Sequence, residues 1–128
     1  MKRYMILLNA NGKCRLIECD KDGTLTLQAM QVLVDGPIEV TKSTLGPCWA
    51  REPVDCINLI VNEEGMLRQL PYNESATELY EYSDKDVILG DALLAAARFD
   101  DLIGFSEHVC RTLVQEYSLK MEDEKWKA

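Results

Sequence analysis

The sequence has few of the features that identify membrane-spanning or secreted proteins. In 128 residues, no apolar run approaches the roughly 18 residues that indicate a membrane span. The apolar stretch near the start extends only from Tyr4 to Leu8, where Asn9 ends it, and a signal peptide needs about 7–15 apolar residues. We therefore predict a first β-strand at this position and a cytoplasmic protein with no membrane partner.

The cysteines lack the pattern of a disulfide framework or a zinc site. Their odd number, without a secretion signal, argues against disulfides and predicts reduced, mostly buried thiols. Only Cys14 and Cys19 approach the spacing of zinc ligands, and their odd separation in one strand directs them to opposite faces. We expect no metal or other cofactor. The five cysteines are Cys14, Cys19, Cys48, Cys56 and Cys110.

Catalytic signatures are also scarce. Histidine occurs once, at His108, two positions from Cys110. Residues two apart on a helix do not face each other, so this pair does not supply the base that a catalytic cysteine needs. No phosphate-binding loop, Gly-x-Ser-x-Gly or His-Glu-x-x-His motif occurs. We predict no catalytic residue, and keep an enzyme that uses cysteine or carboxylate chemistry as an alternative.

Positive charge is scarce in the second half of the chain. The net charge is −8; residues 1–61 balance seven acidic against seven basic side chains, whereas residues 62–128 have fifteen against seven. Between positions 74 and 107, nine acidic residues stand against Lys85 and Arg98. Because phosphate backbones require the opposite sign, direct nucleic-acid binding is not expected. An acidic decoy that mimics DNA is a second alternative.

The composition, 47% hydrophobic and 28% charged, is typical of one globular domain. We place this domain at residues 1–121, followed by a charged tail at 122–128. The hydrophobic pattern predicts an α+β fold, with a mixed, mostly antiparallel sheet of five to seven strands, one short helix and a C-terminal amphipathic helix. Strands are expected at 3–19 (a hairpin), 38–42, 56–61, 66–70 and 86–90.

Turn and cap residues define these elements more closely. Asn11-Gly12 predicts a type I′ turn in the first hairpin, and Gly65 a turn with positive φ before 66–70. Thr24 or Thr26 is expected to cap a helix near 27–34 that ends at Gly36. Ser106 is expected to cap a helix that runs to about position 121. The irregular stretch 43–55 is predicted to pack onto the core through Trp49.

Several segments carry a family resemblance. They are Asn-Glu-Glu-Gly at 62–65, Leu-Pro-Tyr-Asn at 70–73 and Ile-Leu-Gly-Asp-Ala-Leu at 88–93. With the opening hairpin and the segments 34–40 and 99–106, they resemble the family called domain of unknown function 3846. The resemblance covers most of the chain, although the 43–55 loop is long for the family and Ala95 to Ala97 replaces more β-like residues.

The resemblance implies more than the local patterns do. Composition leaves 92–97 open between helix and strand, and the resemblance favours strand for 92–94. Members are typical of bacteriophages and conjugative elements, which implies a small accessory protein of a mobile element in the bacterial cytoplasm. It implies no reaction, because fold or family alone does not assign a function.

The candidate site consists of two polar segments, the turn at 62–65 and the corner at 70–73. Turn chemistry alone explains Asn, Gly and Pro there, which is the structural interpretation. In the functional interpretation, polar turn residues on a rigid scaffold converge on one rim of the sheet and bind a ligand. We therefore predict a non-enzymatic binding module for a host protein or a small molecule. The candidate contact residues are Asn62, Glu63, Glu64, Gly65, Tyr72 and Asn73.

Overall fold

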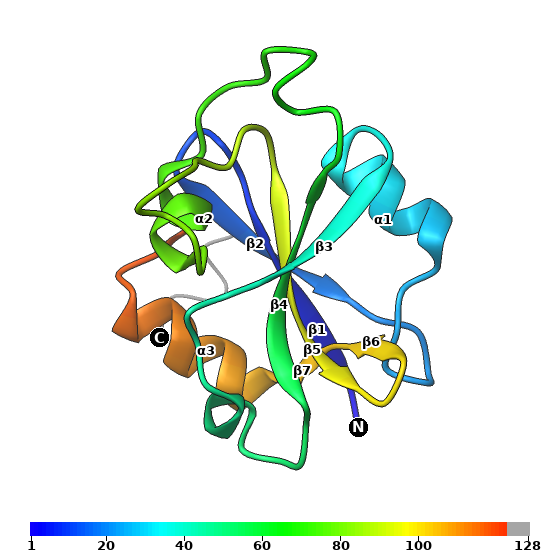
Figure 1. The fold of residues 1–128 in the computed structure, drawn as a ribbon. Helices are drawn as coiled ribbons and strands as arrows, with labels where there is room; N and C mark the ends of the chain where they lie inside the picture. The colour runs from blue at the N-terminus through cyan, green and yellow to red at the C-terminus, as the bar shows by residue number, and fades with distance from the viewer. Residues whose placement is uncertain (123–128) are drawn as a thin grey trace.

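The computed structural model describes residues 1–122, and an eight-stranded sheet forms its centre (Figure 1). The strand order is β3-β4-β5-β1-β2-β8, with β6 paired to β5 and β7 to β1. Only β2 and β8 pair in parallel, so the fold is α+β with a mixed, mostly antiparallel sheet, as predicted. The strands are β1 (Arg3–Leu8), β2 (Lys13–Glu18), β3 (Ile38–Lys42), β4 (Cys56–Asn62), β5 (Ala92–Arg98), β6 (Asp101–Ile103), β7 (Phe105–Ser106) and β8 (Lys120–Met121).

Helices cover the two faces of the sheet unequally. In Figure 1, α2 (Glu74–Leu79) and α3 (Glu107–Glu116) lie to the left of the sheet, and α1 (Leu27–Val34) lies to the right. A larger core cluster joins Leu59 and Leu94 of the sheet to Leu113 of α3, and a smaller one joins Ile60 to Met30 of α1. Adjacent residues Leu59 and Ile60 belong to different clusters because successive side chains of a strand point to opposite faces.

The element counts differ from the prediction. Eight strands replace the expected five to seven, because β6, β7 and β8 are only two or three residues long and have no periodic pattern. The helix α2 and a short 3₁₀ helix, η1 (Pro47–Ala50), were not predicted. None of the helices in the described part of the chain is long and apolar enough to cross a membrane.

The segment 92–97, which composition leaves open, lies in the central strand β5, and this confirms the strand that the resemblance favours for 92–94. Alanine favours helices in isolation, but β5 pairs with β4 on one edge and β1 on the other, and tertiary pairing overrides that preference. Its side chains serve both core clusters: Ala96 lies in the larger and Ala95 in the smaller. Both are fully buried, so small side chains let the neighbouring elements pack closely.

The first hairpin is confirmed, but its turn is not type I′. Gly12 has a positive φ of 89°, whereas Asn11 does not, and a type I′ turn requires positive φ at both positions. Gly12 N donates to Asn9 O (3.0 Å), and Asn9 N donates to Lys13 O (2.8 Å). This pattern is that of a longer hairpin loop with glycine in the left-handed position, the common alternative to a two-residue turn.

The helix α1 begins as predicted and ends one residue earlier than expected. Thr26 is the cap, since its Oγ1 accepts a hydrogen bond from Ala29 N at 3.0 Å. At the other end Asp35, rather than Gly36, adopts the left-handed conformation, with φ 64°. Asp tolerates this region better than most residues, and Arg68 donates to both its carbonyl and its carboxylate oxygens.

The helix α3 is capped by Ser106, as predicted, but it does not reach position 121. It ends at Glu116, and the chain then forms the short strand β8 beside β2. This path places the Met121 side chain in the core, with its sulfur 3.3 Å from Cys14 Sγ, which a continued helix would not allow. Beyond Glu122, the predicted charged tail lies outside the described residues.

The predicted return strand at 66–70 is wrong. These residues form turns, with Leu70 N donating to Gly65 O at 3.0 Å. Both edges of β4 are already paired, to β3 and β5, so no position beside it remains for a hairpin partner. Gly65 has no positive φ either. Instead, a Cβ there would lie 2.8 Å from Leu89 O, so glycine permits a close backbone approach.

The predicted strand at 86–90 is also wrong. In this segment only Leu89 pairs, in an isolated antiparallel bridge with Tyr72. The flanking bonds, Gly90 N to Pro71 O (2.7 Å) and Asn73 N to Ile88 O (2.9 Å), join the segment to the 71–73 corner. Ile88 is buried with Leu79 of α2, and its N–H donates to Thr77 Oγ1 at 2.9 Å, so the segment contacts α2 and does not extend the sheet.

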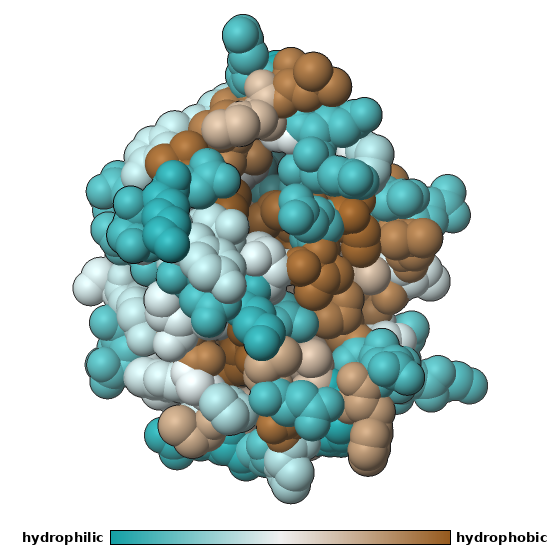
Figure 2. Space-filling view, viewed as in Figure 1, coloured by the Kyte–Doolittle hydropathy of each residue, from teal (hydrophilic) through white to brown (hydrophobic). Residues whose placement is uncertain are grey.

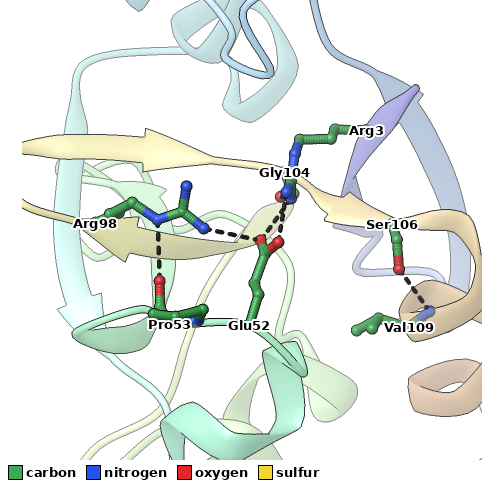
Figure 3. A network of polar contacts seen from close by, with 7 residues as sticks. All are labelled: Arg3, Glu52, Pro53, Arg98, Gly104, Ser106 and Val109. Atoms are coloured by element: carbon green, nitrogen blue, oxygen red, sulfur yellow. Dashed lines mark hydrogen bonds and ion pairs between the residues drawn. The ribbon is translucent and has the colours of Figure 1, made fainter. Parts of the chain in front are cut away.

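The 43–55 stretch is held to the rest of the fold by two side chains. Trp49 packs against the larger core cluster and lies 5.8 Å, centroid to centroid, from the Tyr117 ring, which confirms its predicted role. Glu52 accepts two hydrogen bonds from the Arg3 guanidinium and pairs with Arg98 at 3.4 Å (Figure 3). These hydrogen bonds, followed by the charges of both arginines, hold the pKa of Glu52 below its usual value.

Candidate functional site

The two asparagines of the predicted site hold the fold together. Asn62 Nδ2 donates to Val34 O and Asp35 O, both at 3.0 Å, and so ties the end of β4 to the end of α1. Asn73 is fully buried; its Nδ2 donates to Leu8 O and Gly90 O, both at 2.9 Å. These bonds leave neither amide nitrogen available to an external ligand.

The other four predicted residues have different surroundings. Glu63 is exposed, Glu64 is half-buried, and Gly65 is buried against the backbone of 89. Tyr72 is 52% exposed, but it lies at the Leu89 bridge and does not line the hollow that Glu63 and Gly65 border. The structure therefore brings Asn62, Glu63 and Gly65 to one place. Glu64, Tyr72 and Asn73 do not line it.

That place is a hollow of about 190 Å³ at the β3 edge of the sheet. Its floor includes Glu39 and Thr41, which lie on the face of β3 that also carries the larger core cluster. The end of β4 and the Gly65 turn form one wall. The 80–89 segment, with Tyr80 and Asp86, forms the other.

The hollow is acidic. Glu39, Glu63 and Asp86 contribute carboxylates, and none of the lysines and arginines within residues 1–122 lines it. All three side chains belong to exposed residues, and within residues 1–122 none forms an ion pair. Like charges gathered at one concave place raise the local concentration of cations. A cationic group is therefore the ligand chemistry that fits this hollow.

The hydrogen bonds at the two ends of β3 determine which of its residues face β4. Glu63 N donates to Pro37 O at 2.8 Å, and Ser43 N donates to Ile57 O at 3.1 Å. Directly opposed residues alternate between hydrogen-bonded and non-hydrogen-bonded pairs along an antiparallel ladder. The odd-numbered residues of β3 therefore bond to β4, and the even-numbered ones direct their backbone groups to the free edge.

The free edge is closed at only one end. Lys42 O accepts a hydrogen bond from Glu81 N at 3.1 Å, so the 80–82 segment covers that end. The outward N–H and C=O groups of Ile38 and Val40 have no hydrogen-bond partner among the described residues. Such a row of open backbone groups is a template for another strand.

The other side of the same edge is apolar. Val40 is 46% exposed, and Ile38 and Leu33 are half-buried against the smaller core cluster. Figure 2 shows hydrophobic side chains gathered beside β3 on the side of α1. The β3 edge therefore separates an acidic hollow from an apolar strip, which we define as Leu33, Ile38 and Val40.

The three buried cysteines offer no comparable site. Burial raises the pKa of Cys14 and Cys19 to about 11, and it also raises the pKa of Cys110. These thiols are protonated at neutral pH and are poor nucleophiles. Among residues 1–122, no three His, Cys, Asp or Glu side chains are placed to hold a metal ion. His108 is exposed at the start of α3.

Sequence patterns missed half of the hollow. Glu39 and Thr41 belong to a correctly predicted strand, and their shared face follows from its alternation. No local sequence pattern indicates that Tyr80 and Asp86 lie near these two residues, because long-range packing brings them to the hollow. The acidic bias of 74–107 was the one signal that pointed toward this wall.

A family model described as Domain of unknown function (DUF3846) matches residues 1–118. No curated protein shows significant similarity to the chain, and no solved structure does. The family match covers strands β1 to β7, the helices α1, α2 and α3, and the residues described as lining the acidic hollow; β8 lies just beyond it.

Proposed function

Because the chain belongs to the family Domain of unknown function (DUF3846), whose description names no reaction, we propose a function from the site itself. The protein is a non-enzymatic binding module, and its acidic hollow receives a cationic group of the ligand. The observation that carries this proposal is that Glu39, Glu63 and Asp86 surround one concavity that no lysine or arginine of the described part of the chain lines.

The family resemblance of the sequence supports a biological context for this function. In that context the chain is an accessory protein of a phage or conjugative element and acts in the bacterial cytoplasm. The ligand is then a host protein or a small host molecule with exposed positive charge. The net charge of −8 supports such a ligand, since long-range attraction speeds its encounter with the protein.

Titration with two cationic probes, tetralysine amide and tetra-arginine amide, tests the proposal by calorimetry at low and moderate salt. The variants Glu39→Gln, Glu63→Gln and Asp86→Asn remove one charge each, and a triple variant removes all three. Each exposed carboxylate contributes modestly, so a single change is expected to weaken binding about 1.5-fold to fivefold. Raising the salt concentration is expected to weaken binding further.

The matched control is Glu116→Gln, which removes an exposed carboxylate from α3, away from the hollow. It is expected to leave affinity unchanged. Equal losses from Glu116→Gln and Glu39→Gln would contradict the proposal and favour a diffuse acidic decoy. An absence of binding to both probes would also contradict it. Turnover of a substrate that disappears on changing one cysteine would establish the enzymatic alternative instead.

A further inference from the structure

We infer that the ligand is an extended polypeptide segment that joins the sheet as an additional strand beside β3, with cationic and apolar residues in alternation. This inference rests on the proposed function, because its cationic residues occupy the same acidic hollow. It goes further in naming the class of partner, the mode of binding and the sequence pattern that is recognised.

The backbone of β3 supplies the first argument. The open N–H and C=O groups belong to Ile38 and Val40, which lie two positions apart and face the same free edge. An extended segment placed there forms the regular ladder by which peptides add to exposed sheet edges. The bond from Glu81 N to Lys42 O ends the ladder at that side. The open segment of β3 is therefore short, and side chains have to contribute to the specificity with which an added strand is bound.

The hollow supplies the second argument. In an antiparallel pairing to the free edge, Ile38 and Val40 occupy hydrogen-bonded positions and Glu39 occupies the non-hydrogen-bonded position between them. Side chains at such a position lie closest across the two strands, with Cα atoms about 4.5 Å apart. The residue opposite Glu39 shares its face and enters the hollow beside Asp86. Lysine or arginine is the complementary choice there.

The apolar strip supplies the third argument. Residues on either side of the cationic one point to the opposite face of the sheet. That face of β3 presents Val40, which is 46% exposed, and Ile38, which packs against the smaller core cluster. Apolar side chains of the added strand would cover these residues and remove them from water. The recognised pattern is therefore apolar-cationic-apolar.

A second copy of this chain fits the edge less well. Pairing of β3 with β3 of another molecule would bring two acidic hollows side by side at the spacing of neighbouring strands, about 4.8 Å. Like charges at that distance are destabilising. Charge complementarity therefore favours a basic segment of a different protein as the occupant.

Three short peptides test the inference on the full-length protein. The first alternates, acetyl-Val-Lys-Val-Lys-Val-amide. The second has the same composition in blocks, acetyl-Val-Val-Val-Lys-Lys-amide. The third is the alternating peptide with its central valine N-methylated, which removes one backbone donor and keeps the charge. The alternating peptide is expected to bind at least about tenfold more tightly than either of the others. The N-methylated peptide loses a backbone hydrogen bond to β3, and the block peptide loses the alternation of lysine and valine.

Variants of Val40 test the same point from the protein side. Its N–H faces the free edge, so Val40→Pro removes an outward donor without removing a bond to β4, and proline is accepted in edge strands. Val40→Thr keeps the donor and is the matched control. We expect Val40→Pro to weaken the alternating peptide at least about tenfold relative to Val40→Thr. If Val40→Pro fails to fold, the comparison of the three peptides on the unchanged protein decides alone.

The failures of the two proposals are distinguishable. Equal affinity for the parent and N-methylated peptides would overturn strand addition, and so would equal affinity for the alternating and block peptides. The binding module would still stand if Glu39→Gln weakened all of them. Dimerisation through β3 without peptide, detected by a mass of twice the chain that Val40→Pro abolishes, would overturn the inference in favour of self-pairing.

Discussion

The Nδ2 atom of Asn73 lies 2.9 Å from the carbonyl oxygen of Leu8, which precedes it by 65 positions. The same nitrogen donates to Gly90 O, and Asn73 Oδ1 accepts from Ala76 N at the start of α2. One fully buried side chain thus joins the end of β1, the turn two residues before β5 and the start of α2. A polar residue that the sequence marks as a ligand contact is an internal connector.

Replacing Asn73 with Ala is expected to lower the free energy of unfolding by about 2–4 kcal/mol, since it removes a cap and leaves buried carbonyl groups without partners. Urea unfolding of both proteins measures the difference. Tyr72→Ala is the neighbouring control, and because Tyr72 is half exposed we expect a smaller effect. A loss below about 0.5 kcal/mol for Asn73→Ala would contradict the structural role.

Gly65→Ala tests the close approach of two backbone segments. The added Cβ would lie 2.8 Å from Leu89 O, so the wall of the hollow has to shift, at a cost of about 1–3 kcal/mol. Gly46→Ala is a matched control, because its Cβ would meet only Cys48 Sγ, at 3.7 Å. Thermal unfolding of the two variants should separate them by several degrees. Equal melting temperatures would contradict a close approach of the backbone at Gly65 to Leu89 O.

Glu52→Gln is expected to destabilise the protein by about 1–3 kcal/mol at pH 7, because the Arg3 guanidinium loses its charged partner. The Arg3 hydrogen bonds hold the pKa of Glu52 below its ordinary value of 4.5. The pair therefore stabilises the fold fully above that ordinary pKa, and the stabilisation is lost as the pH falls through the lower pKa of the folded state.

Urea unfolding at pH 7, 5 and 3 measures this dependence. The two proteins should differ most at pH 7 and converge at acidic pH. Glu107→Gln, which removes an exposed ion pair with Arg111 on α3, is the control and should change stability by about 1 kcal/mol or less. A difference between the Glu52 variant and the parent that stays constant with pH would show that the carboxylate charge is not what stabilises the fold.

The cysteines are expected to react in a fixed order with iodoacetamide at pH 8. Cys48 is exposed and should be modified first. Cys14 and Cys110 are buried, and burial raises the pKa of both thiols, so they should react only after unfolding. Peptide mapping by mass spectrometry at successive times measures the order. Modification of Cys110 as fast as Cys48 would contradict the packing of α3 against the sheet.

Local chemistry predicts the parts of this fold that depend on neighbouring residues. Caps at Thr26 and Ser106 lie where side-chain oxygens precede an amphipathic run, and the strand at 38–42 follows from alternation. Local chemistry does not decide the structure where pairing partners do. Composition leaves 92–97 open between helix and strand, and its two neighbours make it the strand β5. The strand predicted at 66–70 is wrong because both edges of β4 are occupied.

The candidate site likewise has a part that local chemistry predicts and a part that depends on long-range packing. Turn chemistry marks Glu63 and Gly65, which border the hollow, but it does not distinguish them from Asn73, whose amide is used internally. Neither the placement of Glu39 and Asp86 around one hollow nor the open edge of β3 has a local signature. Both depend on strand order, which is a property of the whole chain.

Amide hydrogen exchange along β3 tests the central claim, an open strand edge, most directly. In the free protein, the N–H groups of Ile38 and Val40 should exchange quickly, and those of Glu39 and Thr41, which bond to β4, should be protected. Adding the alternating Val-Lys peptide should protect Ile38 and Val40 selectively. Strong protection of Ile38 and Val40 without any peptide would contradict an open edge, and unchanged fast exchange at saturating peptide would contradict strand addition.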